Sequence, residues 1–440
     1  MAIGATMGTR KEKLAIHGGP KTVEQERKEL FHWPIMTEED ERAVIAVLRA
    51  GKCSEIEINR EFEKEWGAYL GTKYNLAHCN GTCSLLSAMY GVGVGRGDEV
   101  IGPSLVYWGG AMQAFVLGAT PVFADIDPQT LCIDPNDIEK RITKRTKAII
   151  LVHQYGHPAD MDAIMAIARR HGIKVIEDVS HAQGSLYKGR MCGTLGDVAG
   201  ISMMGGKSFV AGEGGMLSTN DRMIYERAVA LCHYERALTD ITDPKLRAVV
   251  AADGFRSGLP LLGIKGRMNQ TCSAFGRVQL KYFQSRIEEI QRAMNRFWDL
   301  LEGGGGTPGL RPHRPAKDSG STMGGWYNPV GHYVPEELGG LPVGKFIEAV
   351  DAEGGRCGRG VNFPLHLHPV LNVGDAFGDG KPTRVAFTNR DVREGKGSLP
   401  ASEALGERAL GIPWFKHDWP EEIEKYAAAW KKVAEHFRTK

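Results

Sequence analysis

The chain has 440 residues, of which 25% are charged, and its formal net charge at pH 7 is +2. A chain of this length can bury a large hydrophobic core and is expected to contain more than one domain. Its nearly balanced charge gives no bulk attraction to nucleic acid or to a membrane surface, so small molecules are the expected partners. No stretch of the sequence approaches the roughly 18 apolar residues that cross a bilayer.

The cysteines and the first residues of the chain indicate the cellular compartment of the protein. Eight cysteines are scattered without a Cys-x-x-Cys pair or a regular spacing. In a chain this long, such scatter favours reduced thiols over a disulfide framework or a zinc knuckle. Residues 1–13 lack the apolar core of a secretory signal. The sequence therefore predicts a soluble, cytoplasmic protein without a bound metal.

The first segment with a chemical signature is a turn that enters a helix, Asn80-Gly81-Thr82-Cys83. Free backbone N–H groups and the helix dipole at such a turn favour a bound phosphate. The glycine-rich run 91–97 does not fit a dinucleotide-binding loop, because its glycine spacing is wrong and it precedes a strand instead of following one. Cys79 and Cys83 flank the turn, but their position alone does not make them reactive.

From about residue 75 to 220, short apolar runs alternate with helical patterns in a βαβ rhythm. This rhythm predicts a mostly parallel sheet whose two faces are covered by helices. One of the helices is predicted to begin at Asp160 as its cap and to bury Ile164, Ile167 and Ala168. The predicted strands include residues 100–102, 121–124, 148–152, 175–176 and 199–201.

Two carboxylates, Glu177 and Asp178, follow the predicted strand at 175–176. In an open α/β sheet, side chains at the carboxyl end of a strand face the crevice where ligands bind. Asp178 is therefore a candidate site residue.

Lys207 is a single amine in a run that changes from apolar to glycine-rich, Ser202-Met203-Met204-Gly205-Gly206-Lys207. A poorly hydrated lysine has a lowered pKa and can act as a nucleophile. Most lysines are surface residues, but this one follows a phosphate turn and a buried acid. Pyridoxal phosphate needs a phosphate site, an acid at its pyridine nitrogen and a lysine for a Schiff base, so the three groups together match that cofactor.

Apolar side chains step by three and four from Leu280 to Leu301 and predict a long amphipathic helix that ends at the glycine run 303–306. The Gly- and Pro-rich stretch up to Gly325 is predicted to be a surface loop or linker. We place the change of domain along this helix. The predicted organisation is an N-terminal segment 1–35, a large cofactor-binding α/β domain 36–285 and a small C-terminal domain 286–440.

Several motifs occur together along nearly the whole chain. They are Leu14 to Lys21, Asn80-Gly81-Thr82, residues 97–101, residues 121–127, Glu177-Asp178, residues 202–207, Gly212 to Gly215, residues 399–403 and residues 410–414. In this order they resemble the DegT/DnrJ/EryC1/StrS family of pyridoxal-phosphate-dependent sugar and cyclitol aminotransferases. The resemblance implies an aspartate-aminotransferase-like fold (PLP fold type I), with a large domain built on a mostly parallel sheet and a smaller C-terminal α+β domain.

The resemblance also implies roles for individual residues around the cofactor. Lys207 would form the Schiff base, and Asp178 would pair with the pyridine nitrogen. Tyr107 stands where the family places an aromatic ring on the cofactor, and His181 stands where the family often has a glutamine beside the phenolic oxygen. Gly81, Thr82 and Ser202 would hold the phosphate.

The stretch Gly263 to Asn269 resembles a Gly-x-Asn-Tyr-Arg-Met motif that crosses to the neighbouring subunit in family members. Lys265 replaces the asparagine and would serve the partner's phosphate through charge, while Gly266 replaces the aromatic residue. This implies a homodimer with shared active sites. Arg267 and His366 match residues near the amino-donor pocket.

The function implied is transamination in two half-reactions, with glutamate or glutamine as donor and Lys207 as the proton carrier. The acceptor would be a keto-cyclitol such as scyllo-inosose, of the kind found in antibiotic biosynthesis, or a nucleotide-linked keto-sugar. The N-terminal Gly18-Gly19-Pro20-Lys21 segment and Lys265 look most like the cyclitol branch.

Three alternatives stay open from the sequence. A sugar dehydratase of the same fold would carry histidine in place of Lys207, and a cofactor-binding protein without turnover would keep the same residues. A metal-dependent hydrolase could use His153, His366 and His368, since His366-Leu367-His368 would place two imidazoles on one face of a strand. The histidine spacing matches no zinc signature, however, and leaves Lys207 without a role.

Overall fold

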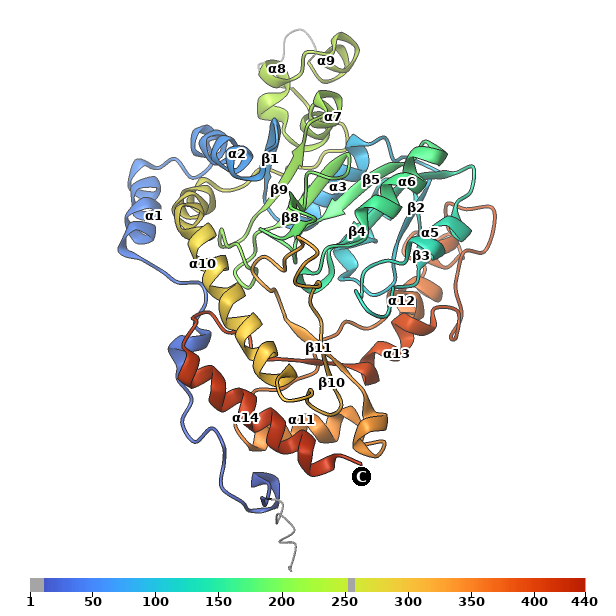
Figure 1. Ribbon diagram of the computed structural model, residues 1–440. Coiled ribbons are helices and arrows are strands. Elements are labelled where there is room, and N and C mark those ends of the chain that lie inside the picture. Colours follow the sequence, from blue (N-terminus) through green and yellow to red (C-terminus); the bar gives the residue numbers. More distant parts are fainter. Residues whose placement is uncertain (1–11, 252–257, 440) are drawn as a thin grey trace, which may run out of the picture.

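The computed structural model describes residues 12–251 and 258–439. Figure 1 shows a large α/β body, with a smaller layer containing the C-terminal helix beneath it. The prediction that residues 1–13 carry no secretory signal falls almost entirely outside the described residues. Within the described residues, no helix combines the length and the apolar character that a membrane span requires.

A seven-stranded sheet in the order β1-β9-β8-β5-β4-β2-β3 forms the centre of the large body. The four pairings from β8 to β3 are all parallel, whereas β9 runs antiparallel to both of its neighbours. The predicted mostly parallel sheet is therefore confirmed. Its strands are β1 (Tyr74–His78), β2 (Glu99–Pro103), β3 (Thr120–Ala124), β4 (Thr146–Val152), β5 (Lys174–Asp178), β8 (Val198–Ser202) and β9 (Gly215–Thr219).

Helices cover both faces of this sheet because successive side chains of a strand point to opposite sides. In β4, Ile149 belongs to the core on one face and Ile150 to the core on the other. The first core includes side chains of α2 (Glu57–Leu70), α6 (Met161–His171) and the first half of α10 (Gln270–Glu302). The second core includes side chains of α3 (Gly81–Gly91) and α7 (Arg222–Cys232).

Two helix predictions are confirmed in detail. The Asp160 side chain caps α6 by accepting a hydrogen bond from the Ala163 amide at 3.3 Å. The long helix α10 is capped by Asn269 and ends at Glu302. Its buried stripe belongs to the large-body core as far as Ile287 and to a second core from Ile290 onward. The domain boundary placed at 285/286 lies beside this change and stays a prediction.

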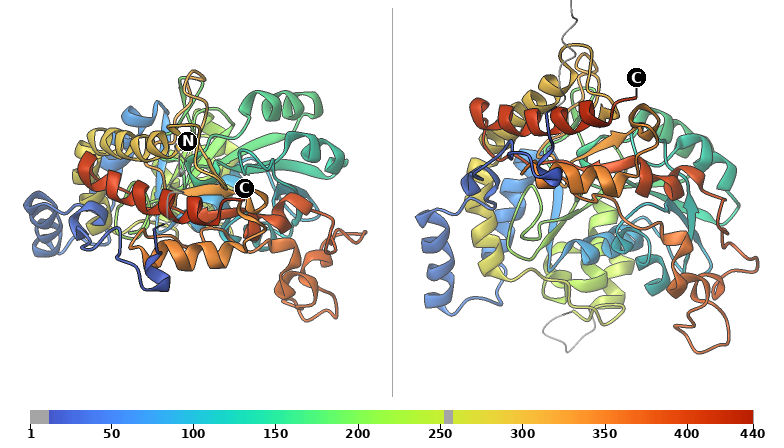
Figure 2. Two further views of the ribbon diagram at one scale, coloured as in Figure 1. Left: turned by 60° about the horizontal axis from the view of Figure 1, so that its bottom comes forward. Right: turned by 90° about the horizontal axis from the view of Figure 1, so that it is seen from below.

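The second core holds the small layer together. A three-stranded sheet, β10 (Leu310–Pro312), β11 (Val330–Tyr333) and β12 (Ala409–Gly411), packs with α11 (Val343–Ala352) and α14 (Pro420–Phe437). Leu14 and Leu30 from the N-terminal segment join the same core. Figure 2 shows this segment on the same side of the molecule as α11 and α14.

One segment of the predicted small domain returns to the large sheet. Leu365, Leu371 and Leu399 pack with Phe123 at the end of the sheet. The prediction that His366-Leu367-His368 forms a strand is wrong, because the segment is a 3-10 turn (Leu365–Leu367) followed by α12 (Pro369–Asn372). Prolines 364 and 369 flank it, and a proline cannot donate to a sheet ladder but suits the first turn of a helix.

The remaining α-helices and strands of the described residues are α1 (Glu38–Ala50), α4 (Gln113–Val116), α5 (Pro135–Arg141), β6 (Leu186–Tyr187), β7 (Arg190–Met191), α8 (Ala237–Asp240), α9 (Pro244–Val250) and α13 (Pro400–Arg408), and short 3-10 turns connect several of them.

Candidate active site

A cavity of about 240 Å³ lies at the carboxyl ends of the parallel strands, where ligands bind in open α/β sheets. Its walls come from the ends of β4, β5 and β8, the first turn of α3, and the loop after β2. Seven of the ten residues that the sequence places at the site line this cavity: Gly81, Thr82, Tyr107, Asp178, His181, Ser202 and Lys207.

Lys207 is held in a turn after β8. Its amide donates to the Met204 carbonyl at 2.9 Å, and its own carbonyl accepts from the Trp33 indole Nε1 at 2.8 Å. The side chain is only 8% exposed, and its Nζ lies 3.9 Å from the centre of the Tyr327 ring. Burial lowers the pKa of the amine to about 8, while the Asp178 charge acts in the opposite direction. Roughly a tenth of the amine is therefore uncharged at pH 7, against less than about 0.1% at the ordinary pKa of 10.5.

Asp178 is the last residue of β5, and its carboxylate reaches the cavity. Its Oδ1 accepts from the Ser180 amide at 2.9 Å. Burial raises the pKa of this carboxyl group, and the hydrogen bonds from Ser180 and the charge of Lys207 oppose that shift. Ser180 also accepts from the Ser202 amide at 2.9 Å, so the acid and the end of β8 are fixed to each other.

The turn before α3 forms an anion cradle. The Asn80 side chain caps the helix by accepting from the Cys83 amide at 2.8 Å. The Gly81 and Thr82 N–H groups are the first of the helix and have no acceptor within it. A Cβ at position 81 would lie 2.5 Å from the Ser202 Cβ, so only glycine allows this approach. The amides of Gly81 and Thr82 and the hydroxyls of Thr82 and Ser202 therefore lie together at a helix N-terminus, an arrangement that fits a phosphate group.

His181 lies between two aromatic rings, with ring centres 5.9 Å from Tyr155 and 4.6 Å from Tyr327. The Tyr155 amide donates to His181 Nδ1 at 3.4 Å, which leaves Nε2 as the protonated nitrogen of the neutral ring. Burial, followed by the charge of Lys207, lowers the pKa of His181 well below its ordinary value. The histidine is therefore a neutral hydrogen-bond donor at neutral pH.

Sequence reasoning missed several residues of the cavity wall. Trp326 and Asn328, which flank Tyr327, have positive φ angles of 54° and 46°. Positive φ is rare for tryptophan and uncommon even for asparagine, and local sequence does not predict it here. The Asn328-Pro329 pair marks a turn, but nothing in it places that turn beside Lys207. The missed wall residues include Tyr155, Glu213, Tyr327, Asn328 and Asn362.

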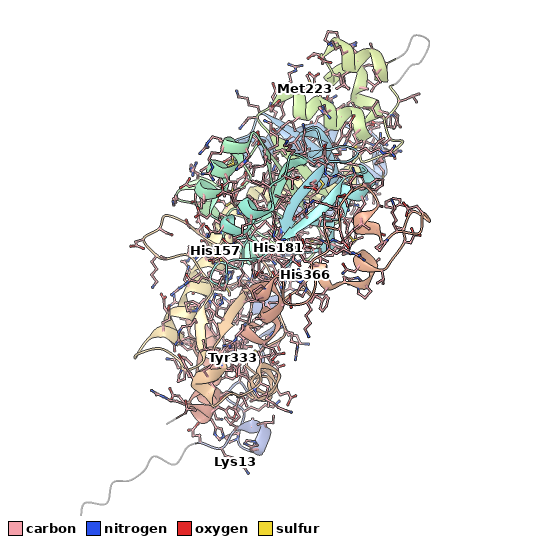
Figure 3. All side chains as sticks on the ribbon, turned by 90° about the vertical axis from the view of Figure 1, so that its right-hand side faces the viewer. Lys13, His157, His181, Met223, Tyr333 and His366 are labelled. Atoms are coloured by element: carbon pink, nitrogen blue, oxygen red, sulfur yellow. The ribbon has the colours of Figure 1, made fainter. Side chains whose placement is uncertain are left out.

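Three predicted site residues do not line the cavity of their own chain. Lys265 is exposed and Arg267 is partly exposed on a segment that runs beside β1, where Arg267 forms a β-bridge with His78. His366 is buried, and its Nδ1 and Nε2 lie 2.7 Å from Ser104 Oγ and 3.0 Å from Glu403 Oε1. In Figure 3, His366 and His181 both lie near the middle of the molecule, between the large body and the small layer. The substrate and cross-subunit roles of these residues stay predictions.

The histidines of the hydrolase alternative are not grouped. His153 has both ring nitrogens engaged, at 3.0 Å from Glu177 Oε2 and 3.0 Å from the Ala159 amide. His368 is exposed and caps α12. Within residues 12–251 and 258–439, the group of potential metal ligands whose atoms lie close together consists of three other residues, His78, Cys232 and His233.

A parallel sheet that presents an acid and a secluded amine beside a helix N-terminus is the arrangement of the fold type I aminotransferases, and the predicted fold class is confirmed. The chain belongs to the DegT/DnrJ/EryC1/StrS aminotransferase family, whose model matches residues 34–371. It is a transaminase.

Named relatives act on cyclitols and sugars. The chain is 32% identical to the L-glutamine:scyllo-inosose aminotransferase of Streptomyces griseus, over 97% of this chain and 98% of that enzyme. It is 40% identical to the GDP-perosamine synthase of Caulobacter vibrioides, over 55% of this chain and only 61% of that enzyme. The aminotransferase structure from Psychrobacter cryohalolentis superposes with a TM-score of 0.78 and 28% identity, over 92% of this chain and 99% of that chain.

Proposed function

We propose that this transaminase uses pyridoxal phosphate and moves an amino group from glutamine or glutamate to the ketone of a free cyclitol ring such as scyllo-inosose. The observation that carries the proposal is the placement of Lys207 and Asp178 in one cavity with the Gly81–Thr82 cradle. When bound, the cofactor carries the amino group and draws into its ring the electrons released at the substrate carbon.

The residues of the chain have separate tasks in this reaction. The neutral Nζ of Lys207 removes the proton from the substrate carbon and returns it, which a pKa of about 8 permits near neutral pH. The Asp178 carboxylate would hold the protonated pyridine nitrogen. His181 would donate to the phenolic oxygen, and Tyr107 would cover the ring.

The character of the cavity wall supports a neutral, hydroxyl-rich acceptor. Its lining contains the uncharged hydrogen-bonding side chains of Tyr155, Tyr327, Asn328 and Asn362. Among the described residues that a single chain contributes to the wall, Lys207 is the only lysine or arginine. Tyrosine and asparagine can donate to and accept from ring hydroxyls, whereas a diphosphate is usually held by cations. The nearly full-length match to an inosose aminotransferase supports the same choice.

A nucleotide-linked keto-sugar is the second candidate, because the match to GDP-perosamine synthase has the higher identity. The test is to prepare the protein with pyridoxamine phosphate and to offer scyllo-inosose or a GDP-linked 4-keto-sugar. We expect the cyclitol to restore the pyridoxal absorbance at least tenfold faster, a difference of about 1.4 kcal/mol in activation free energy. Faster recovery with the nucleotide sugar would reverse the assignment.

A separate experiment tests the cofactor itself. Borohydride reduction of the holoprotein followed by peptide mapping should place the cofactor on Lys207. Protein that takes up no added pyridoxal phosphate, or label on another lysine, would contradict the proposal.

We infer further that the active enzyme is a homodimer. Lys265 is exposed and lies outside the cavity of its own chain, so its charge is available to the cradle of a second copy. An ammonium group there would neutralise part of the phosphate charge that two amides and two hydroxyls leave uncompensated.

A further inference from the structure

A buried cluster of nitrogen and sulfur side chains lies directly beneath the phosphate cradle. Its members are His78 at the end of β1, Cys83 in the first turn of α3, and Cys232 and His233 at the end of α7. We call these four residues the Cys/His cluster. Cys83 is partly buried, and the other three are fully buried. The transamination proposed above gives none of them a role.

The spacing of these atoms is that of ligands around one metal ion. His78, Cys232 and His233 each offer a ligand atom, and the three atoms all lie within 4.8 Å of one another. His233 Nε2 is 3.3 Å from His78 Nδ1, and Cys232 Sγ is 3.9 Å from the same nitrogen. Around a tetrahedral zinc ion, two ligand nitrogens are about 3.4 Å apart and a nitrogen and a sulfur about 3.6 Å apart. The nitrogen pair already matches this spacing, the Cys232–His78 pair is about 0.3 Å too long, and the Cys232–His233 pair lies within 4.8 Å.

Gly266 lets a fourth potential ligand, Cys83, pack beside two of the others. A Cβ built on Gly266 would lie 2.8 Å from Cys83 Sγ, 3.0 Å from Cys232 Sγ and 3.1 Å from His78 Nδ1. These three side chains therefore pack against the backbone of Gly266, where any larger residue would push them apart. Cys83 is not among the three residues whose ligand atoms all lie within 4.8 Å of one another, so its side chain would have to turn toward them. With that movement the four residues form a Cys₂His₂ set, which is a common composition of structural zinc sites.

The surroundings have two further properties of a zinc site. The His233 Nδ1 lies 3.2 Å from Glu235 Oε1, so the carboxylate directs Nε2 of the same ring toward the cluster. A carboxylate that orients a ligand histidine in this way is a regular feature of zinc sites. Two thiolates and one Zn²⁺ also sum to zero charge, which suits a buried position.

We propose that His78, Cys83, Cys232 and His233 bind one Zn²⁺ ion in a closed, structural site. The ion would join the phosphate turn to the end of α7 and to the segment that carries Lys265 and Arg267. Backbone hydrogen bonds already follow this path, since the Gly266 amide donates to the Cys232 carbonyl at 3.0 Å and the Cys79 amide to the Gly266 carbonyl at 2.7 Å. With four protein ligands and no open position, the ion takes no part in chemistry.

The test uses the full-length holoenzyme purified without a metal-affinity tag. After dialysis against zinc and then against buffer, we expect about one zinc per chain by elemental analysis. Cobalt exchanged into the site should give the intense visible d–d bands of a tetrahedral ion, at longer wavelengths than the cofactor absorbs. A zinc content below about 0.1 per chain, or the weak spectrum of octahedral cobalt, would overturn the proposal.

Variants then assign the ligands. Cys232→Ser and Cys83→Ser should each lower zinc affinity at least tenfold in a chelator competition, because a hydroxyl is a far poorer ligand than a thiolate. Cys357→Ser removes another buried thiol, in the small layer, and should leave the zinc content unchanged. If all three variants hold zinc equally, the ion binds elsewhere and the proposed site is wrong. If the ligand variants fail to fold, the cobalt spectrum of the unaltered protein still decides.

Discussion

Burial of a single amine is the central physical feature at the scale of residues. Lys207 is almost wholly enclosed, and its loss of hydration outweighs the attraction of Asp178, so its pKa falls from 10.5 to about 8. An exposed lysine would be protonated at neutral pH and could neither attack an aldehyde nor accept a proton from carbon. By enclosing the residue, the fold therefore gives this amine the lowered pKa that a nucleophilic lysine needs.

Replacement of Lys207 by alanine should lower the transamination rate by a factor on the order of 10³ or more, because the proton carrier is lost together with the covalent attachment. Stopped-flow measurement of the half-reaction with glutamine would show this. Lys64→Ala removes an exposed lysine of α2 and should leave the rate within twofold. A Lys207→Ala variant within tenfold of the unaltered enzyme would contradict the assigned role.

The lowered pKa predicts how cofactor uptake depends on pH. Only the neutral amine attacks the aldehyde, so the rate at which apoprotein takes up pyridoxal phosphate should rise with pH and level off above about 8. The Asp178 carboxylate raises the Lys207 pKa, so Asp178→Asn should move the midpoint to lower pH. The measurement is uptake rate against pH for both proteins. A midpoint that moves upward in the variant would show that the sign is wrong.

At the scale of elements, local patterns predict the parallel strands, the Asp160 cap and the long helix α10, because each depends on residues close in sequence. The antiparallel strand β9 was not predicted. It begins at Gly215, the last residue of a glycine run with the composition of a loop, and it becomes a strand by pairing with β8 and with β1, which is distant in sequence. Tertiary pairing of this kind overrides local propensity.

The candidate site also combines residues that local sequence predicts with residues that only the tertiary structure places. Lys207, Asp178 and the Gly81 turn carry their chemistry in local motifs, and the structure brings them together. Tyr327 reaches the cavity from the small layer through a backbone of unusual conformation, so no local pattern could place it. His366 is engaged by Ser104 and Glu403. Those contacts join segments more than 30 residues apart. The spacing within His366-Leu367-His368 therefore could not predict them.

The close approach of α3 to β8 gives a prediction about Gly81. In Gly81→Ala the new methyl group would meet the Ser202 Cβ at 2.5 Å and the Ser202 Cα at 2.7 Å, so the helix must move away. We expect a loss of about 1–3 kcal/mol in the free energy of unfolding and at least a tenfold weaker affinity for pyridoxal phosphate. Urea unfolding and cofactor titration measure the two effects.

Gly95→Ala is the matched control for this variant, because a Cβ there would meet nothing within 4 Å. It should leave both quantities nearly unchanged. Cofactor affinity in Gly81→Ala equal to that of the control would show that the turn does not bind the phosphate.

At the scale of the whole molecule, α10 is the element that connects the two cores. Its first half packs under the central sheet, and its second half carries Ile290, Met294 and Phe297 into the small layer. Tyr327 and Asn362 enter the cavity from the chain beyond this helix. If the proposed function holds, the position of the small layer sets the substrate side of the cavity and the sheet sets the cofactor side.

The proposed dimer predicts recovery of activity when two impaired variants are mixed. A Lys207→Ala subunit keeps Lys265, and a Lys265→Ala subunit keeps Lys207, so a mixed dimer would contain one complete site if Lys265 acts on its neighbour. Statistical exchange of subunits in equal amounts should then restore about a quarter of the unaltered activity per subunit, because half of the dimers are mixed and each has one complete site of two. The measurement is activity after unfolding the two variants together and refolding them, with separately refolded variants as the control. Activity that stays at the average of the separate variants would show that Lys265 does not complete the active site of its neighbour.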